Sequence, residues 1–118
     1  MTEKRVWNLT GRDITYDDGR TRRILGANGT AWVPQDTSPA PSVQGMMTSH
    51  IGYGSITGLP GDIGKGDVVI LSTRAADYVV REMKEFCDRV TILCPNWGSN
   101  CKRGPNGVPQ SIGSFFRR

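Results

Sequence analysis

The chain has 118 residues, of which 15 are Lys or Arg and 11 are Asp or Glu, so its net charge at pH 7 is +4. A chain of this length can bury one modest hydrophobic core but not two, so we expect a single domain over residues 1–118. No apolar run approaches the length of a membrane span, and no signal peptide is recognisable, which predicts a soluble, intracellular protein.

The first third of the chain has the short runs of a β-meander. A strand is predicted over residues 6–9, and residues 14–16 continue it after a bulge or turn. Residues 17–19, Asp-Asp-Gly, predict a hairpin turn, because glycine readily adopts the positive φ that such a turn needs. Residues 21–25 would form the returning strand, and residues 30–33 a further strand that ends at the following proline.

Two segments in the middle of the chain lack a hydrophobic period. Residues 35–45 are rich in Pro, Ser and Thr and predict an exposed loop, whereas residues 46–53 predict a short strand that carries the only histidine, His50. Residues 54–66 are rich in glycine and include Gly64-Lys65. A phosphate-binding P-loop needs Ser or Thr after the lysine and lies between a strand and a helix. Here glycine follows the lysine and a strand comes next, so tight turns are predicted instead.

Residues 66–95 predict a βαβ unit. Residues 68–71 form a continuous aliphatic run, which is typical of a strand buried on both faces, and residues 90–93 repeat this pattern. Between them, apolar residues recur every three or four positions from Ala75 to Phe86, which indicates one amphipathic helix capped by Ser72 or Thr73. The handedness rule for this unit makes its two strands parallel neighbours or near neighbours.

The last part of the chain predicts a second hairpin and a closing strand. Asn106-Gly107 is a turn signal, and residues 112–116 predict a strand with Phe115 or Phe116 facing inward. The predicted fold class is therefore α/β (α+β). It consists of a small mixed β-sheet with an N-terminal β-meander, one central βαβ unit with a single main helix, and a C-terminal hairpin.

The three cysteines, Cys87, Cys94 and Cys101, lie too far apart in sequence for the close pairs of a zinc site. Buried free thiols are expected, and a Cys94–Cys101 redox pair is the alternative. No metal, cofactor or catalytic residue is predicted, because no nucleophile or carboxylate can be placed beside His50.

The strand ends of the βαβ unit predict a binding crevice. The carboxyl ends of parallel strands share one edge of a sheet, so the start of the helix and the loop after the second strand face the same solvent. The helix start offers unpaired N–H groups and a positive dipole, arginines bind phosphate, and tryptophan stacks on a base. Asn8 and Thr10 either reach this edge or only complete a turn. The alternative to binding is that Ser72 or Thr73 only caps the helix and that Trp97 packs under its own loop. The predicted ligand-binding residues are Ser72, Thr73, Arg74, Asn96, Trp97, Ser99, Asn100, Lys102 and Arg103.

Four stretches follow the order of one protein family: Asn8-Leu9-Thr10, Gly58-Leu59-Pro60, residues 69–76, and residues 103–113. Together they resemble small bacteriophage-encoded proteins that open with Asn-Leu-Thr-Pro-His, pass through Gly-Leu-Pro, carry a strand end of Ile-Val-Ser before a helix, and finish on a basic β-hairpin. In this chain Gly11-Arg12 stands in place of Pro-His, so no role of that histidine carries over. The resemblance implies a phage protein of the host cytoplasm, or of the virion, that acts as an accessory factor.

These observations predict a non-enzymatic phage accessory protein that binds a nucleotide-like anionic small molecule and sequesters a host immune signalling nucleotide. One alternative is a structural or minor virion protein that associates with copies of itself through exposed strand edges. The other alternative is a DNA- or RNA-binding protein, whose affinity would fall steeply with salt. Its basic residues would be those grouped at 20–23, 102–103 and 117–118.

Overall fold

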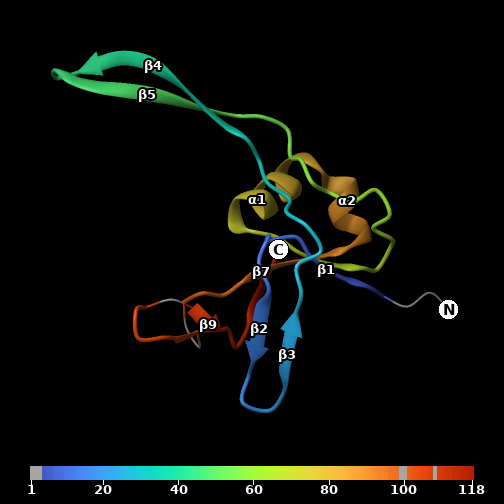
Figure 1. Ribbon diagram of the computed structural model, residues 1–118. Coiled ribbons are helices and arrows are strands. Elements are labelled where there is room, and N and C mark those ends of the chain that lie inside the picture. Colours follow the sequence, from blue (N-terminus) through green and yellow to red (C-terminus); the bar gives the residue numbers. More distant parts are fainter. Residues whose placement is uncertain (1–3, 99–100, 108) are drawn as a thin grey trace.

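The computed structural model describes residues 4–98, 101–107 and 109–118. A four-stranded sheet with the strand order β1-β6-β7-β10 lies at its centre (Figure 1). The strands β1 (Val6–Asn8), β6 (Val68–Ile70) and β7 (Thr91–Pro95) run parallel to one another. β10 (Phe115–Arg117) runs antiparallel to β7 at the edge of the sheet. The coarse class, a mixture of helix and strand with more strand than helix, agrees with the sequence.

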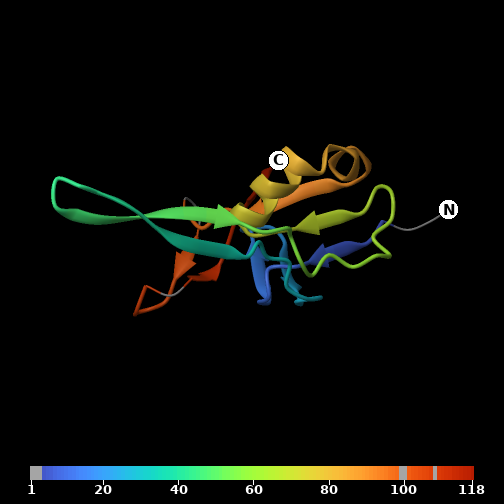
Figure 2. The same cartoon turned by 90° about the horizontal axis from the view of Figure 1, so that it is seen from above.

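The predicted strand–helix–strand unit is confirmed, with its two strands as parallel neighbours. Its helical part is divided into α1 (Thr73–Glu82) and α2 (Lys84–Arg89), so the prediction of a single helix is wrong. The division falls at Met83, whose φ of −129° and ψ of 57° are not helical. Both helices lie on one side of the central sheet, and the hairpin formed by β2 (Ile14–Asp17) and β3 (Arg22–Leu25) extends from the other (Figure 1). Figure 2 shows the molecule from above, with the central strands spread across the view.

The core is concentrated on the helix-covered face of the sheet. Val69 and Leu71 pack there against Ala75, Ala76 and Val79 of α1, and all five are fully buried. Successive residues of a strand face opposite sides of a sheet, so Ile70 enters a second, smaller cluster with Ile14 and Ile112. β6 is therefore buried on both faces, which explains its continuous aliphatic sequence.

The predicted N-terminal meander is wrong in its connections. The hairpin of β2 and β3 forms with its turn at residues 18–21, but β1 does not pair with β2. β1 instead joins the central sheet beside β6, because Gly11, with a φ of +83°, turns the chain out of that sheet. The strand predicted over residues 30–33 is also absent. Thr30 and Trp32 each form only one isolated bridge.

The prediction of an exposed loop over residues 35–45 is wrong as well. β4 (Gln35–Val43) pairs with β5 (Met46–Tyr53) in a long hairpin that projects from the body of the protein (Figure 1). Gln44 and Gly45 both have positive φ, as a two-residue type I′ turn requires. The strand predicted over residues 46–53 is confirmed. Exposed edge strands tolerate proline, which is why the prolines of β4 misleadingly indicated a loop.

The C-terminal hairpin is confirmed. β8 (Lys102–Arg103) and β9 (Pro109–Ser111) pair around the turn that contains Asn106 and Gly107. In β10, Phe115 is half-buried against the second core cluster, whereas Phe116 is exposed.

All three cysteines are free thiols, but only Cys94 is buried, in the core, whereas Cys87 and Cys101 are half-buried, so the expectation of buried thiols is confirmed for Cys94 alone. Burial raises the pKa of the Cys87 and Cys94 thiols above the ordinary value. Both thiols therefore stay protonated at neutral pH. Over the described residues, none of the helices is both long enough and apolar enough to cross a membrane.

Candidate functional site

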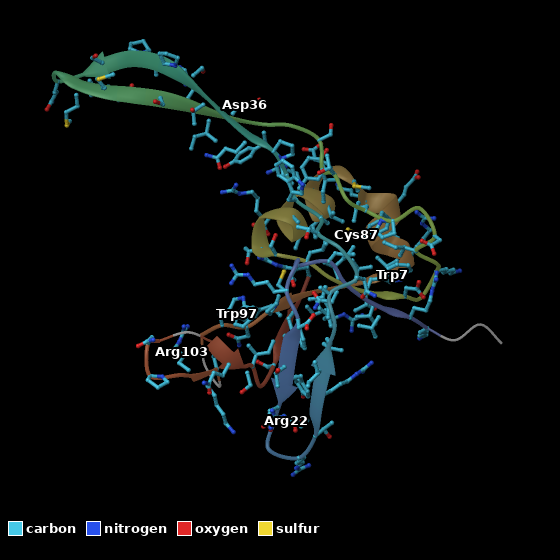
Figure 3. The ribbon with its side chains drawn as sticks, in the orientation of Figure 1. Trp7, Arg22, Asp36, Cys87, Trp97 and Arg103 are labelled. Atoms are coloured by element: carbon cyan, nitrogen blue, oxygen red, sulfur yellow. The ribbon has the colours of Figure 1, made fainter. Side chains whose placement is uncertain are left out.

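A cleft of about 520 Å³ lies at the carboxyl ends of β1, β6 and β7. Each of these strands is followed by residues that line it, and we call it the strand-end cleft. Figure 3 shows Trp97, one of these residues, between α1 and the β8–β9 hairpin. The lining residues are Thr10, Arg12, Asp13, Ser72, Thr73, Pro95 and Trp97.

The start of α1 forms one wall of the strand-end cleft. Ser72 caps the helix, with its hydroxyl accepting a hydrogen bond from the Ala75 N–H at 3.4 Å and its carbonyl accepting one from the Ala76 N–H at 2.9 Å. The first N–H groups of a helix have no partner within it. The N–H groups of Thr73 and Arg74 therefore remain available at the positive end of the helix dipole.

Of the seven predicted ligand-binding residues that the structure describes, four do not line the strand-end cleft: Arg74, Asn96, Lys102 and Arg103. Arg74 lines a neighbouring cavity of about 380 Å³, where its guanidinium carbon lies 5.7 Å from the centre of the Tyr53 ring. Lys102 lines a third cavity, with its Nζ 3.8 Å from an oxygen of Asp17. Ser99 and Asn100 lie outside the described residues.

Asn96 and Arg103 support the loop of Trp97 instead of facing the cleft. The Asn96 amide donates to the Ser114 hydroxyl at 3.0 Å and accepts from the Gly98 N–H at 3.0 Å. The Arg103 guanidinium donates to the carbonyl oxygens of Trp97, at 2.8 Å, and Gly107, at 3.0 Å. Their hydrogen bonds hold the backbone on either side of the indole.

Arg12 and Asp13 also line the strand-end cleft, although the sequence patterns did not predict them. They follow β1, whose parallel position beside β6 brings its carboxyl end to the edge where α1 begins. Arg12 is exposed and supplies a cation. Asp13 accepts a hydrogen bond from the Ala27 N–H at 2.8 Å through one carboxylate oxygen, and its second oxygen has no protein donor among the described contacts. One signal for these two residues was present in the sequence: Asn8-Leu9-Thr10 places polar side chains at the end of a strand, as Ser72 does after β6.

Asn8 organises the loop that carries Thr10, Arg12 and Asp13. Its side chain is buried, and its amide NH₂ group donates to the carbonyl oxygens of Arg12, at 2.7 Å, and Leu25, at 2.9 Å. Its amide oxygen accepts from the N–H of Thr10 at 3.2 Å and from its hydroxyl at 2.6 Å. Every donor and acceptor of the amide is used, so a single side chain fixes the loop beside the cleft.

We expect Asn8→Asp to destabilise the protein by about 2 kcal/mol or more at pH 7, because a carboxylate oxygen would face two carbonyl oxygens in place of an NH₂ group. That environment raises the pKa of the introduced carboxyl. The loss should therefore grow as the pH rises through that pKa, and urea denaturation at pH 4.5 and pH 7 measures it. Asn28→Asp is the matched control, since the described contact of Asn28 uses only its oxygen, which accepts from the Asn8 N–H. Equal stability of the two variants would contradict this role.

Comparisons with known proteins assign no family: no family model, curated protein or solved structure matches this chain. Within residues 4–98, 101–107 and 109–118, no three His, Cys, Asp or Glu side chains are arranged to hold a metal ion. The functional proposal therefore starts from the strand-end cleft.

Proposed function

We propose that the protein binds a nucleotide-like small molecule with one anionic group in the strand-end cleft. The observation that carries this proposal is the meeting of three features around one cavity: the free N–H groups at the start of α1, the cation of Arg12, and the indole of Trp97, which is 42% exposed. The volume of about 520 Å³ is within the range of roughly 300–1,000 Å³ that small-molecule sites have.

Each feature suits a different part of such a ligand. An anionic group at the helix start would accept hydrogen bonds from the Thr73 N–H and hydroxyl and would pair with Arg12. A base would stack on Trp97, an interaction worth about 1–3 kcal/mol. The free oxygen of Asp13 would accept a hydrogen bond from a sugar hydroxyl or a base amino group. Because Asp13 offsets the charge of Arg12, the site favours a ligand with few negative charges over a polyphosphate.

The proposed role is binding without turnover. The cleft offers hydroxyls from Thr10, Ser72 and Thr73. A hydroxyl becomes a nucleophile when a base is hydrogen-bonded to it, and no described contact joins one of these hydroxyls to a histidine or to the carboxylate in the lining. His50 lies on β5, in the projecting hairpin. The resemblance to phage proteins supports the more specific proposal, which is that a phage accessory protein in the host cytoplasm sequesters a signalling nucleotide.

A panel of mono-, di- and cyclic nucleotides in a thermal-shift assay tests the proposal. A ligand that binds only the folded state raises the melting temperature, by several degrees for a domain of this size at saturation. With that ligand, calorimetric titration should show an affinity loss of about tenfold or more for both Arg12→Ala and Trp97→Ala. Arg22→Ala, which removes an exposed arginine of β3, is the control and should bind like the wild type.

Two results would contradict the proposal: a panel without any shift, or unchanged affinity in both cleft variants. A steep fall of affinity with salt, seen with long polynucleotides and not with single nucleotides, would instead favour the nucleic-acid alternative.

A further inference from the structure

The hairpin of β4 and β5, which we call the arm, is a two-stranded sheet that pairs with no other strand of the described chain. Figure 1 shows it projecting from the body of the protein. The arm expands the molecule, whose radius of gyration is 17.2 Å, compared with about 13–14 Å for a compact domain of this length. An isolated two-stranded hairpin is only marginally stable in water, so the arm requires a partner surface to be well ordered.

The surface of the arm lacks charge and carries exposed apolar side chains. Between residues 35 and 53, Asp36 is the only Asp, Glu, Lys or Arg, although these residues make up 22% of the chain. Met47, Ile51 and Tyr53 are separated by even numbers of residues along β5, with Ser49 between the first two, and therefore share one face. All three are exposed, and Met47 is 95% exposed. An exposed apolar stripe without charge is typical of an interaction surface.

The two edges of the arm differ. β4 contains Pro39 and Pro41, which have no N–H to donate, and its pairing with β5 shifts register between Ala40 and Val43, an irregularity that also hinders the addition of another strand. β5 contains neither proline nor a charged side chain, the two devices that usually prevent an edge strand from pairing with another chain. The arm therefore has one edge open to strand addition and one edge blocked.

We propose that β5 pairs antiparallel with β5 of a second copy of this chain and forms a four-stranded sheet across a two-fold axis. The second copy is the partner that these features fit. The arm has no Lys or Arg that would bind an acidic partner, and only one carboxylate, Asp36, that would bind a basic partner. Its uncharged open edge can pair with the same edge of a second copy. Registers that oppose odd-numbered residues place the stripes of Met47, Ile51 and Tyr53 from both copies on one face. Because each outer edge would then be β4, with its prolines, the assembly closes at two copies and does not extend into a fibre.

Analytical ultracentrifugation of the full chain over a concentration series tests this proposal. We expect the wild type to sediment with twice the 12.9 kDa chain mass at high concentration and to dissociate on dilution. The double variant Met47→Lys and Ile51→Lys places like charges at the shared edge and should weaken dimerisation by about a hundredfold or more. Gln44→Lys adds the same kind of charge at the turn, outside β5, and should dimerise like the wild type.

Hydrogen exchange locates the contact. In the wild type, amides of β5 should exchange more slowly as the concentration rises, and this dependence should disappear in the double variant. The thermal transition of the body should be unchanged in that variant, because Met47 and Ile51 are exposed. A wild type that is monomeric at all concentrations, or a double variant that remains dimeric, would overturn the proposal.

Discussion

Replacing Gly58 with alanine should destabilise the protein by about 3 kcal/mol or more, enough to leave much of the chain unfolded at 37 °C. The Cβ of an alanine would overlap the carbonyl oxygen of Thr30, a backbone atom that cannot move aside as a flexible side chain can. Gly58 also has a φ of +86°, which L-residues adopt at a cost. Urea denaturation of purified protein, or its yield in soluble form, measures the effect.

Gly61→Ala is the matched control within the same glycine-rich segment. A Cβ at Gly61 would meet no atom within 4 Å, and Gly61 has no positive φ. We therefore expect Gly61→Ala to unfold at nearly the wild-type urea concentration. Similar midpoints for the two alanine variants would show that the close approach of Gly58 to Thr30 is not required.

Thr30 brings two short stretches of the sequence together at Gly58. Thr30 pairs with Thr10, at the end of Asn8-Leu9-Thr10, and its backbone passes Gly58, at the start of Gly58-Leu59-Pro60. Gly11 has a φ of +83°, so a proline at this position could not adopt the observed conformation.

Asp67→Ala is expected to lower the melting temperature by about 10 °C or more. The buried carboxylate of Asp67 accepts hydrogen bonds from the Arg5 N–H at 3.0 Å, the Trp7 indole N–H at 2.9 Å and the Gly64 N–H at 2.8 Å. It joins β1 to the turn before β6, and alanine would leave three donors without an acceptor. Thermal denaturation measures the shift.

Asp62→Ala is the control for Asp67→Ala. Asp62 also contacts the Arg5 guanidinium, with a 3.4 Å ion pair, but its side chain is exposed. Exposed ion pairs contribute little to stability, so the melting temperature should change by only a few degrees at most. Equal losses in the two variants would mean that the contacts of Asp67 are not specifically important.

The same carboxylate predicts a pH dependence. The N–H groups of Arg5, Trp7 and Gly64 lower the pKa of Asp67 from 3.8 to about 2. Because the folded-state pKa lies below the unfolded one, the stabilisation is complete above about pH 4 and is lost as the pH falls towards 2. The difference in stability between the wild type and Asp67→Ala should therefore shrink over that interval. A constant difference would contradict this assignment.

The parts of the fold that could be predicted are those whose residues are buried and the hairpins whose turns contain Asp-Asp-Gly or Asn-Gly. The aliphatic runs of β6 and β7 and the helical period of α1 follow directly from the surfaces that they bury. Of the arm, only β5 was predicted as a strand, whereas β4 could not be recognised, because a strand without a buried face has no alternating pattern to read. The pairing of β1 with β6 is also absent from the local sequence, since it joins segments about sixty residues apart.

The residues of the candidate site were likewise predictable only where local sequence patterns place them. Ser72, Thr73 and Trp97 follow from parallel strands whose carboxyl ends share an edge. Arg12 and Asp13 required the position of β1, which local patterns do not contain. Arg74 was misplaced because each step along a helix turns the side chain by about 100°, and this single step carries it from the strand-end cleft to the cavity beside Tyr53.

Nuclear magnetic resonance mapping of a bound nucleotide tests whether the strand-end cleft is the binding site. With the best ligand of the thermal-shift panel, we expect the largest chemical-shift changes at the Trp97 indole N–H and at the backbone amides of Arg12, Thr73 and Arg74. Amides of the arm and of β3 should remain unchanged. Shift changes confined to other surfaces, or none at millimolar ligand, would contradict binding in the strand-end cleft.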